Sequence, residues 1–323
     1  MLRVGICGAG FIAQAHSDGY ASLPSEARVT RVVDPRLDHA ERLAARHGAV
    51  ASADFADLLG SNVDAISLCT PTPTHAQLAI AAMRAGKHVL CEKPIARRLA
   101  EAEAMIAASE ETGAKLMVGH VVRYEEDHRR AREIVASGEI GELRMASQSI
   151  TGPFPDWSAA GWFADPAQSG GPVLDLAVHS FDFLNWVFAS PVVRVSAVGV
   201  RCPIPLHSHA LVTLRFADGG IGLVEASWAH PRGQGLLART ELMGSRGRIA
   251  WDYDAIAAVQ VIRDDRKNHV FTGDVWAAEI GDFLRCVRDG TPSPIPGAVG
   301  LAALRVGLAA VESLETGRTV DVG

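Results

Sequence analysis

The chain has 323 residues and a formal net charge of -6 at pH 7, with 48% hydrophobic and 21% charged residues. This composition is typical of a soluble globular protein that is long enough to form two domains. The mildly acidic balance and the lack of a long Lys/Arg run do not favour nucleic acid as a partner.

Cysteine usage and the two ends of the chain indicate a compartment. The odd number of cysteines and the lack of a CxxC pair predict buried free thiols in a reducing compartment. The five are Cys7, Cys69, Cys91, Cys202 and Cys286. The N-terminus "MLRVGICGAG" begins a strand at once, which leaves no room for a signal peptide. The apolar stretch 297–311 is interrupted by Arg305 and is too short to span a bilayer. We therefore expect a cytoplasmic protein with no membrane partner.

The first 120 residues alternate between apolar runs and segments of helical spacing. The runs lie at 2–7, 29–34, 63–70, 87–92 and 115–119, and the predicted helices at 36–48, 74–86 and 99–113. Runs that are apolar throughout fit strands buried on both faces. Strand–helix alternation with short connections predicts an α/β domain with a doubly wound parallel sheet over residues 1–120.

The pattern changes beyond residue 120. A helix followed by a turn is predicted at 126–143, and helices at 170–188, about 276–289 and about 297–316. Strands are predicted at 192–201, 209–216, 220–228, 238–252 and 257–264. Turn signals at 217–220 and 244–247 separate strands that follow one another without a helix. Residues 121–323 therefore form a predicted α+β domain with a large, mostly antiparallel open sheet.

The segment "GICGAGFIAQAH" carries a G-x-G-x-x-G/A fingerprint directly after the first strand. Gly8 allows a tight turn, Gly10 lets the backbone approach a pyrophosphate, and helix amides face the anion. Asp34 ends the second predicted strand, where it would accept hydrogen bonds from the adenosine ribose. A 2′-phosphate would face this carboxylate, which favours NAD. Arg36 partly offsets that effect, so NADP stays open. The alternative is a Gly-rich turn with a surface Asp.

Lys93, in "CEKPIA", follows the predicted strand at 87–92. Open α/β sheets bind ligands at the carboxyl edge of their strands, so Lys93 would lie where a nicotinamide binds. Pro94 restricts the backbone there, and its peptide bond is a candidate for the cis form. The alternative is a solvated surface lysine.

Asp175 and His179 lie four residues apart, so on one helix they would share a face. A carboxylate can orient an imidazole, and histidine is the natural proton acceptor near neutral pH. A helix-start Asp beside a core His is an equal alternative. Asp175, His179 and Asp182 could also hold a metal, but further ligands are lacking, and no metal is expected.

Three features together resemble the glucose–fructose oxidoreductase / inositol dehydrogenase (Gfo/Idh/MocA) family. They are "GICGAGFIAQAH", "TPTPTHAQLAIAAMRAGKHVLCEKPIA" and "SGGPVLDLAVHSFD", in matching order and spacing over essentially the whole chain. The resemblance implies a Rossmann domain, a substrate-binding and oligomerisation domain with an open sheet, and NAD(P)-dependent oxidation or reduction of a sugar, inositol or related polyol. Pro172 and Ala177 stand where the family commonly has glycines, which leaves the substrate open.

The resemblance also assigns residues. Its catalytic residues fall on Lys93, Asp175 and His179. Its cofactor-binding positions fall on Gly8, Gly10, Phe11, Ile12, Thr70, Pro71 and His75, to which we add Asp34, Arg36, Glu92 and Lys93. Lys93, Arg123, Trp162, Asp175 and His179 are expected to contact substrate.

The loop at 151–168 combines aromatic and polar residues, as a sugar pocket would, although its tryptophans could equally pack on the core. An exposed sheet face predicts a homodimer or homotetramer. Two further functions stay open: a redox-neutral glycosidase or lyase that uses NAD transiently, and a non-catalytic nucleotide or sugar sensor.

Overall fold

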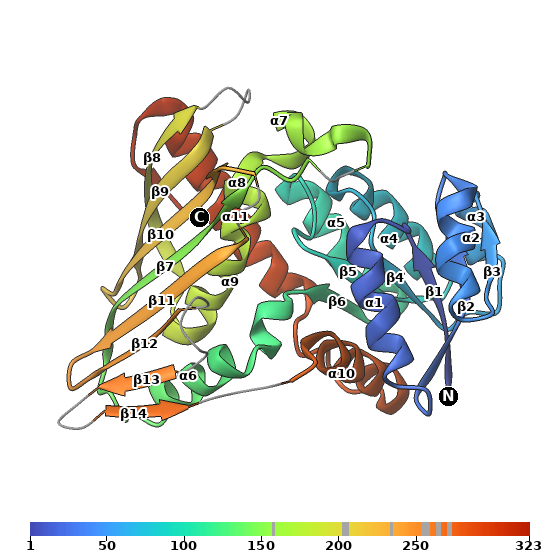
Figure 1. The fold of residues 1–323 in the computed structure, drawn as a ribbon, viewed down its shortest axis with the longest axis horizontal. Helices are drawn as coiled ribbons and strands as arrows, with labels where there is room; N and C mark the ends of the chain where they lie inside the picture. Colours follow the sequence, from blue (N-terminus) through green and yellow to red (C-terminus); the bar gives the residue numbers. More distant parts are fainter. Residues whose placement is uncertain (157–158, 202–206, 233–234, 253–258, 263–265, 270–272) are drawn as a thin grey trace. The chain divides into compact units, whose positions relative to one another are not determined.

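The computed structural model describes residues 1–156, 159–201, 207–232, 235–252, 259–262, 266–269 and 273–323 (Figure 1). Contacts divide them into two compact units, which are described separately. The first comprises Met1–Val121 and Asp274–Leu301, and the second Val122–Gly273 and Ala302–Gly323. The sequence-based division at 120/121 placed all later residues in the second domain, whereas segment 274–301 packs with the first unit.

The first unit is built on a parallel sheet with the order β3-β2-β1-β4-β5-β6. Its strands are β1 (Leu2–Cys7), β2 (Ala27–Val33), β3 (Val50–Ser52), β4 (Ala65–Leu68), β5 (His88–Glu92) and β6 (Leu116–Gly119). The central strands are apolar and buried along most of their length, which is why they sit between helical layers. This doubly wound sheet confirms the predicted fold class of the first domain.

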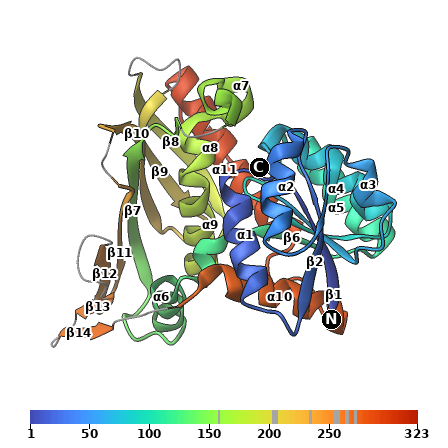
Figure 2. The ribbon, with the colours of Figure 1, turned by 45° about the vertical axis from the view of Figure 1, so that its right-hand side comes forward.

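Helices cover the sheet of the first unit. They are α1 (Phe11–Ala21), α2 (Leu37–Ala45), α3 (Ala56–Leu59), α4 (His75–Arg84), α5 (Leu99–Thr112) and α10 (Val275–Asp289). The pairs α1–α10 and α4–α5 each lie side by side (Figure 1 and Figure 2). α1 approaches α10 closely because Gly19 has no side chain: an added Cβ would stand 2.6 Å from Ile280 Cδ1.

The second unit contains a mixed sheet with the order β14-β13-β12-β11-β7-β10-β9-β8-β15. Its longer strands are β7 (Leu143–Pro153), β8 (Val192–Arg201), β9 (His207–Phe216), β10 (Ile221–His230), β11 (Leu237–Gly244) and β12 (Arg248–Asp252). The short strands are β13 (Val259–Ile262), β14 (Arg266–His269) and β15 (Val320–Asp321). All described pairings are antiparallel except that of β7 with β10. The predicted mostly antiparallel sheet is confirmed.

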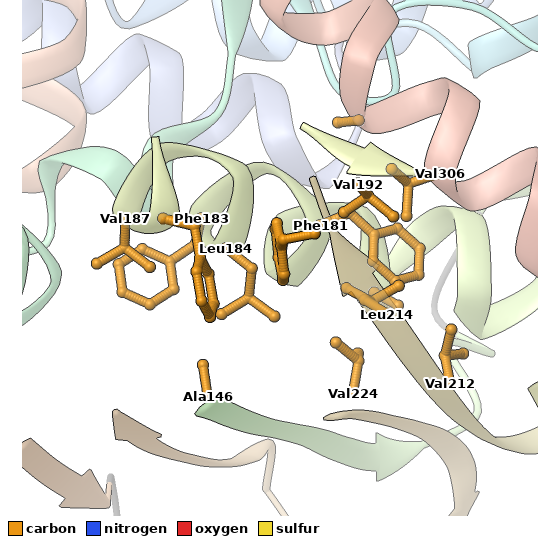
Figure 3. Close-up of a cluster of buried hydrophobic side chains, with 14 of the residues drawn as sticks. Ala146, Phe181, Phe183, Leu184, Val187, Val192, Val212, Leu214, Val224 and Val306 are labelled. Carbon is orange, nitrogen blue, oxygen red and sulfur yellow. The ribbon is translucent and has the colours of Figure 1, made fainter. Parts of the chain in front are cut away.

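The second unit has helices of its own. They are α6 (Glu126–Ala136), α7 (Pro166–Ser169), α8 (Gly171–Asp175) and α9 (Ala177–Phe188), with the short helices η2 (Val121–Tyr124) and η3 (Ala159–Ala164). Of these, α8 and α9 contact the sheet. Figure 3 shows the core, where Phe181 and Leu184 of α9 point toward Leu214 and Val224 of the sheet. Fully burying each such side chain stabilises the fold by about 1.5–3 kcal/mol.

Three sequence-based predictions about this unit were wrong or incomplete. β7 was not predicted, and its last residues were assigned to a loop, although it pairs with both β10 and β11. The helix predicted at 170–188 is two helices, with a break at Leu176. The apolar stretch 297–311 was judged too short to span a bilayer, but α11 (Gly297–Thr316) has 20 residues.

By length and composition alone, α11 could cross a membrane, with a mean hydropathy of 1.5 over its apolar window. Half of that window is buried inside the protein. Ala303, Val306 and Ala310 belong to the core of the second unit. This packing is that of a core helix.

Candidate active site

The loop after β1 is shaped around Gly8. Its φ is +89°, a left-handed conformation that favours glycine, and an added Cβ would stand 2.5 Å from the carbonyl oxygen of Cys69. The Gly8 N–H donates to the carbonyl of Val33 at 2.7 Å. The chain therefore turns sharply between β1 and α1 while it stays pressed against the loop after β4.

Gly10 leaves open space at the start of α1. It is the N-cap residue, and an added Cβ there would meet nothing within 4 Å. Phe11 is 67% exposed, whereas Ala13 is fully buried beneath the helix. The first amides of α1 have no helical partner and carry the positive end of the helix dipole. This cradle fits the pyrophosphate of a dinucleotide, as the sequence predicts.

Asp34 follows β2 and is largely buried. Its Oδ2 accepts the Ala9 N–H at 2.8 Å, and its Oδ1 accepts the Arg36 N–H at 2.9 Å. Each carboxylate oxygen has a second lone pair, so both can also accept a ribose hydroxyl. The Arg36 guanidinium lies 3.9 Å from Oδ1 and its side chain is 46% exposed. The pair therefore suits an uncharged ribose better than a phosphorylated one.

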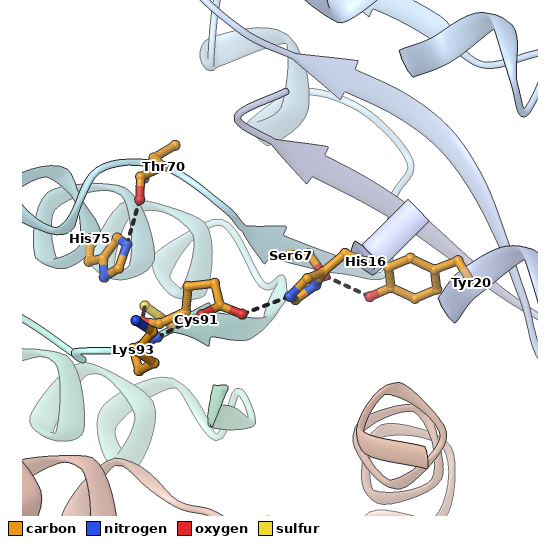
Figure 4. A network of polar contacts seen from close by, with 8 residues as sticks. His16, Tyr20, Ser67, Thr70, His75, Cys91 and Lys93 are labelled. Carbon is orange, nitrogen blue, oxygen red and sulfur yellow. Dashed lines mark hydrogen bonds and ion pairs between the residues drawn. The ribbon is translucent and has the colours of Figure 1, made fainter. Parts of the chain in front are cut away.

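His75 joins the loop after β4 to the loop after β5. Its Nε2 lies 2.8 Å from the carbonyl oxygen of Thr70 (Figure 4). Its Nδ1 lies 3.0 Å from the carbonyl oxygen of Pro94. Burial lowers the pKa of His75, and the two carbonyls oppose that shift. The neutral ring donates to one carbonyl at a time. In the sequence, Pro71 lies between Thr70 and His75, and it is the N-cap residue of η1 (Thr72–Thr74).

Lys93 begins the loop after β5, and the Lys93–Pro94 peptide bond is cis. The Lys93 N–H donates to Glu92 Oε2 at 3.1 Å, and Glu92 Oε1 lies 2.9 Å from His16 Nε2. Behind the imidazole, Ser67 Oγ lies 3.2 Å from His16 Nδ1 and 2.8 Å from the hydroxyl of Tyr20 (Figure 4). Glu92 and His16 are buried. The Lys93 N–H is therefore the outer end of a hydrogen-bond network that continues through these two side chains inside the unit.

Gly8, Thr70 and Lys93 follow β1, β4 and β5, three neighbouring parallel strands. The dinucleotide loop and the lysine therefore lie at the same edge of the sheet, outside the carboxyl ends of the strands. Ligands bind at this edge in open α/β sheets. The first unit thus has the features of the nicotinamide-dependent oxidoreductase class: an anion cradle, a ribose acceptor and a lysine beside them.

The second unit carries Asp175 and His179. Asp175 is the last residue of α8, and His179 lies in the first turn of α9, across the break at Leu176. The Leu176 N–H bonds the Pro172 carbonyl at 2.8 Å, and the His179 N–H bonds the Leu176 carbonyl at 3.1 Å. The two residues therefore do not belong to one continuous helix, contrary to the spacing argument. Their joint action with Lys93 stays a prediction.

Arg123 makes a bidentate ion pair with Asp182. Its Nε and Nη2 donate to the carboxylate oxygens at 2.7 and 2.8 Å, and the guanidinium lies 5.1 Å from the ring centre of Trp186. The Asp182 side chain is 2% exposed. A metal ligand at Asp182 would have to displace this pair, so the alternative metal set receives no support from the geometry.

Trp162 lies in η3 and is half-buried. It stacks on Phe163 with ring centres 4.1 Å apart, and Phe163 packs edge-on against Trp228. This satellite cluster matches the core-packing alternative for part of the loop at 151–168. Trp157 lies outside the described residues.

Sequence reasoning missed two functional candidates, His16 and Glu279, which flank Glu92. His16 lies six residues beyond Gly10, on the buried side of α1, and Glu279 interrupts the apolar face of α10. A charged residue on an otherwise buried helix face was the available signal for Glu279.

Comparison with known proteins gives the same class. The family model described as "Oxidoreductase family, NAD-binding Rossmann fold" matches residues 2–120, and the GFO/IDH/MocA C-terminal domain model matches residues 128–250. The myo-inositol 2-dehydrogenase of Thermotoga maritima is 31% identical, with 99% of this chain and 98% of that protein covered. The levoglucosan dehydrogenase of Pseudarthrobacter phenanthrenivorans is 27% identical, with 99% and 98% covered.

A solved structure of similar shape is a putative myo-inositol dehydrogenase from Sinorhizobium meliloti 1021. It has a TM-score of 0.86 and 27% identity, and both chains are covered completely. This protein belongs to the Gfo/Idh/MocA family of oxidoreductases, with an NAD-binding Rossmann domain. The resemblance, the oxidoreductase activity and the NAD cofactor expected from the sequence are thereby confirmed.

Proposed function

We propose that this oxidoreductase transfers hydride between NAD and a hydroxyl-bearing carbon of an inositol, a related polyol or a sugar. One observation carries the proposal: Gly8, Thr70 and Lys93 follow three neighbouring parallel strands, so the cofactor loop and the lysine share one sheet edge. The relatives named above support the substrate class, since one acts on myo-inositol and another on levoglucosan.

The side chains have separate roles in this proposal. The Lys93 ammonium group holds the substrate hydroxyl and stabilises the alkoxide that develops there. His179 takes the hydroxyl proton and Asp175 orients His179. The nicotinamide, when bound, accepts the hydride at C4. Arg123 and Trp162 are proposed to line the substrate pocket, with Arg123 fixed in place by Asp182.

The proposal is tested by absorbance at the NADH wavelength with NAD, and separately NADP, against inositols, aldoses, sugar acids and amino sugars. Reduction with one polyol or sugar class is expected. Tight NAD binding without reduction across the panel would contradict it and favour the redox-neutral glycosidase or lyase, for which glycoside cleavage is the next assay. Binding with neither reduction nor cleavage would favour the sensor.

Lys93→Met tests the role of the lysine. We expect kcat/KM to fall at least about a hundredfold, because the alkoxide loses its charge partner, while NAD binding is retained. Lys87→Met is the matched control, since Lys87 precedes β5 and donates to the Ser61 carbonyl at 2.8 Å. Turnover of Lys93→Met at the rate of the control would rule out this role.

We also propose that the protein forms a homodimer or homotetramer through the open face of its second sheet. Val198 is 66% exposed and pairs in register with Leu211, which is 40% exposed. Ile221 on β10 adds to this apolar surface. A second copy of the chain would cover it. Among the described residues, Cys7, Cys69, Cys91 and Cys286 are buried free thiols, which supports a reducing cytoplasmic location. Cys202 lies outside the described residues.

A further inference from the structure

A carboxyl group without a hydrogen-bond partner lies inside the first unit. Glu279 of α10 is fully buried, and neither of its carboxyl oxygens has a hydrogen-bond partner among the described residues. Burying such a group without a partner costs free energy, and much more when it is ionised. Its surroundings must therefore explain how it is tolerated.

Glu279 faces the two buried groups that support Lys93. Ligand atoms of His16, Glu92 and Glu279 all lie within 4.8 Å of one another. The ring centre of Trp276, one turn earlier on α10, lies 5.5 Å from that of His16. α10 thus brings Glu279 to the same cluster as Glu92, whose Oε2 accepts the Lys93 N–H.

The three groups cannot all be satisfied with both carboxyls ionised. Burial raises the pKa of Glu92, but the hydrogen bond and charge of His16, with Lys93, outweigh burial and lower it. Burial and the charge of Glu92 both raise the pKa of Glu279 well above its usual value. Two neighbouring buried carboxyls keep one proton between them, and here it resides on Glu279.

We propose that Glu279 is a neutral carboxylic acid, that its proton supplies the donor which two facing carboxylates lack, and that by donating to Glu92 it acts as a positioning residue for Lys93. This inference rests on the proposed role of Lys93 and adds the group that holds its support in place. Glu92 then has both oxygens engaged, by His16 and the Lys93 amide, with Glu279 as a further donor. The carboxylate cannot turn away from Lys93 without breaking these bonds.

A cation shared by the three side chains is the competing arrangement. The 2.9 Å between His16 Nε2 and Glu92 Oε1 is the length of an N–H···O hydrogen bond, so a proton already joins these two groups. The infrared experiment below separates the two arrangements, because a metal-bound carboxyl group carries no proton.

The first experiment measures the protonation of Glu279 directly. The infrared difference spectrum of the full-length protein minus Glu279→Gln at neutral pH should contain the carbonyl stretch of a protonated carboxylic acid. A difference spectrum that shows only a carboxylate band would overturn the proposal. This measurement does not depend on turnover, so it stands even if the proposed substrate class fails.

The second experiment measures positioning. Glu279→Gln keeps a neutral donor, so kcat/KM should stay within about threefold of the wild type. Glu279→Leu removes the donor, and kcat should fall about tenfold with KM for NAD nearly unchanged, since a hydrogen bond to a charged group is lost. If Glu279 were only structural, both variants would be less stable, and Glu279→Leu would not show a lower kcat with an unchanged KM for NAD.

Asp282→Asn is the control on the same helix, because Asp282 pairs with Arg285 at 2.9 Å at the surface. It should change neither kcat nor the infrared carbonyl band. If Lys93→Met loses activity while Glu279→Leu turns over like Asp282→Asn, the lysine assignment stands and the positioning role is overturned. If Glu279→Leu does not fold, an inactive Glu279→Gln with a normal thermal midpoint would equally overturn it.

Discussion

Arg123 and Asp182 form a bidentate ion pair inside the second unit, with donor–acceptor distances of 2.7 and 2.8 Å. The pair is mostly buried, since 12% of the Arg123 side chain and 2% of the Asp182 side chain are exposed. Arg123 belongs to η2 and Asp182 to α9, so the pair ties the start of the unit to its central helix.

Asp182→Asn should destabilise the protein by about 3 kcal/mol, because it leaves the Arg123 guanidinium buried without its counter-charge. Chemical denaturation of the wild type and the variant measures this difference as a lower midpoint at unchanged slope. Glu133→Gln is the control, since Glu133 pairs with Arg130 at 3.1 Å at the surface and should cost less than about 1 kcal/mol. Equal midpoints for the two variants would show that the buried pair is dispensable.

His128 should give the protein a pH-dependent stability. Burial lowers the pKa of His128, but hydrogen bonds and charges from Asp127 and Glu125 outweigh burial and raise the pKa from 6.5 to about 9. The folded pKa is the higher one, so the stabilisation is complete below pH 6.5 and is lost as the pH rises through about 9. It amounts to about 3 kcal/mol.

The measurement is the free energy of unfolding against pH for the wild type and His128→Gln. The gap between the two should be widest below pH 6.5 and should narrow toward pH 9. Gln148 on β7 and Thr240 on β11 complete the network around the ring. A gap that stays constant over this range would mean that His128 does not titrate differently in the folded state.

Alanine substitutions at Gly8 and Gly10 should have different effects, one on stability and the other on NAD binding. Gly10→Ala adds a methyl group in open space, so the thermal midpoint should stay unchanged while the Kd for NAD rises at least about tenfold, because the methyl group occupies the pyrophosphate site. Gly8→Ala meets the Cys69 carbonyl and a left-handed φ, so the midpoint itself should fall. Unchanged NAD affinity in Gly10→Ala would move the pyrophosphate away from this loop.

Asp34 should set the preference between NAD and NADP. In Asp34→Ser the ratio of kcat/KM for NAD to that for NADP should drop at least about tenfold, since a 2′-phosphate no longer meets a carboxylate and Arg36 can bind it. Asp38→Ser on α2 is the control, because Asp38 is exposed and pairs with Arg42. If both variants keep the wild-type ratio, Asp34 does not face the adenosine ribose.

The parts of the fold that could be predicted from the sequence are those with a strong local signal. The runs of the first sheet are mostly apolar, and Gly8 and Gly10 sit between a strand and a helix, so both were recognisable. β7 was missed because its inward face includes Gln148, whose amide serves the His128 network instead of an apolar core. The break at Leu176 lies inside a segment whose apolar spacing continues through it, so only tertiary packing reveals it.

The site was predictable where side chains follow strands and less so where distant segments meet. Lys93 is placed by the strand before it, which a reader of the sequence can see. Glu279 reaches Glu92 from almost two hundred residues further along the chain, and no local pattern links the two.

The first unit is built from two separate segments of the chain, which are synthesised at different times. Its sheet is encoded within the first 121 residues, but α10 belongs to the segment Asp274–Leu301. During synthesis, the ribosome produces every strand from β7 to β14 before Glu279 emerges. The α1 surface around His16 therefore stays uncovered by Glu279 until 278 of the 323 residues have been made. A fragment that ends at residue 121 would lack α10, so its α1 surface around His16 would stay uncovered.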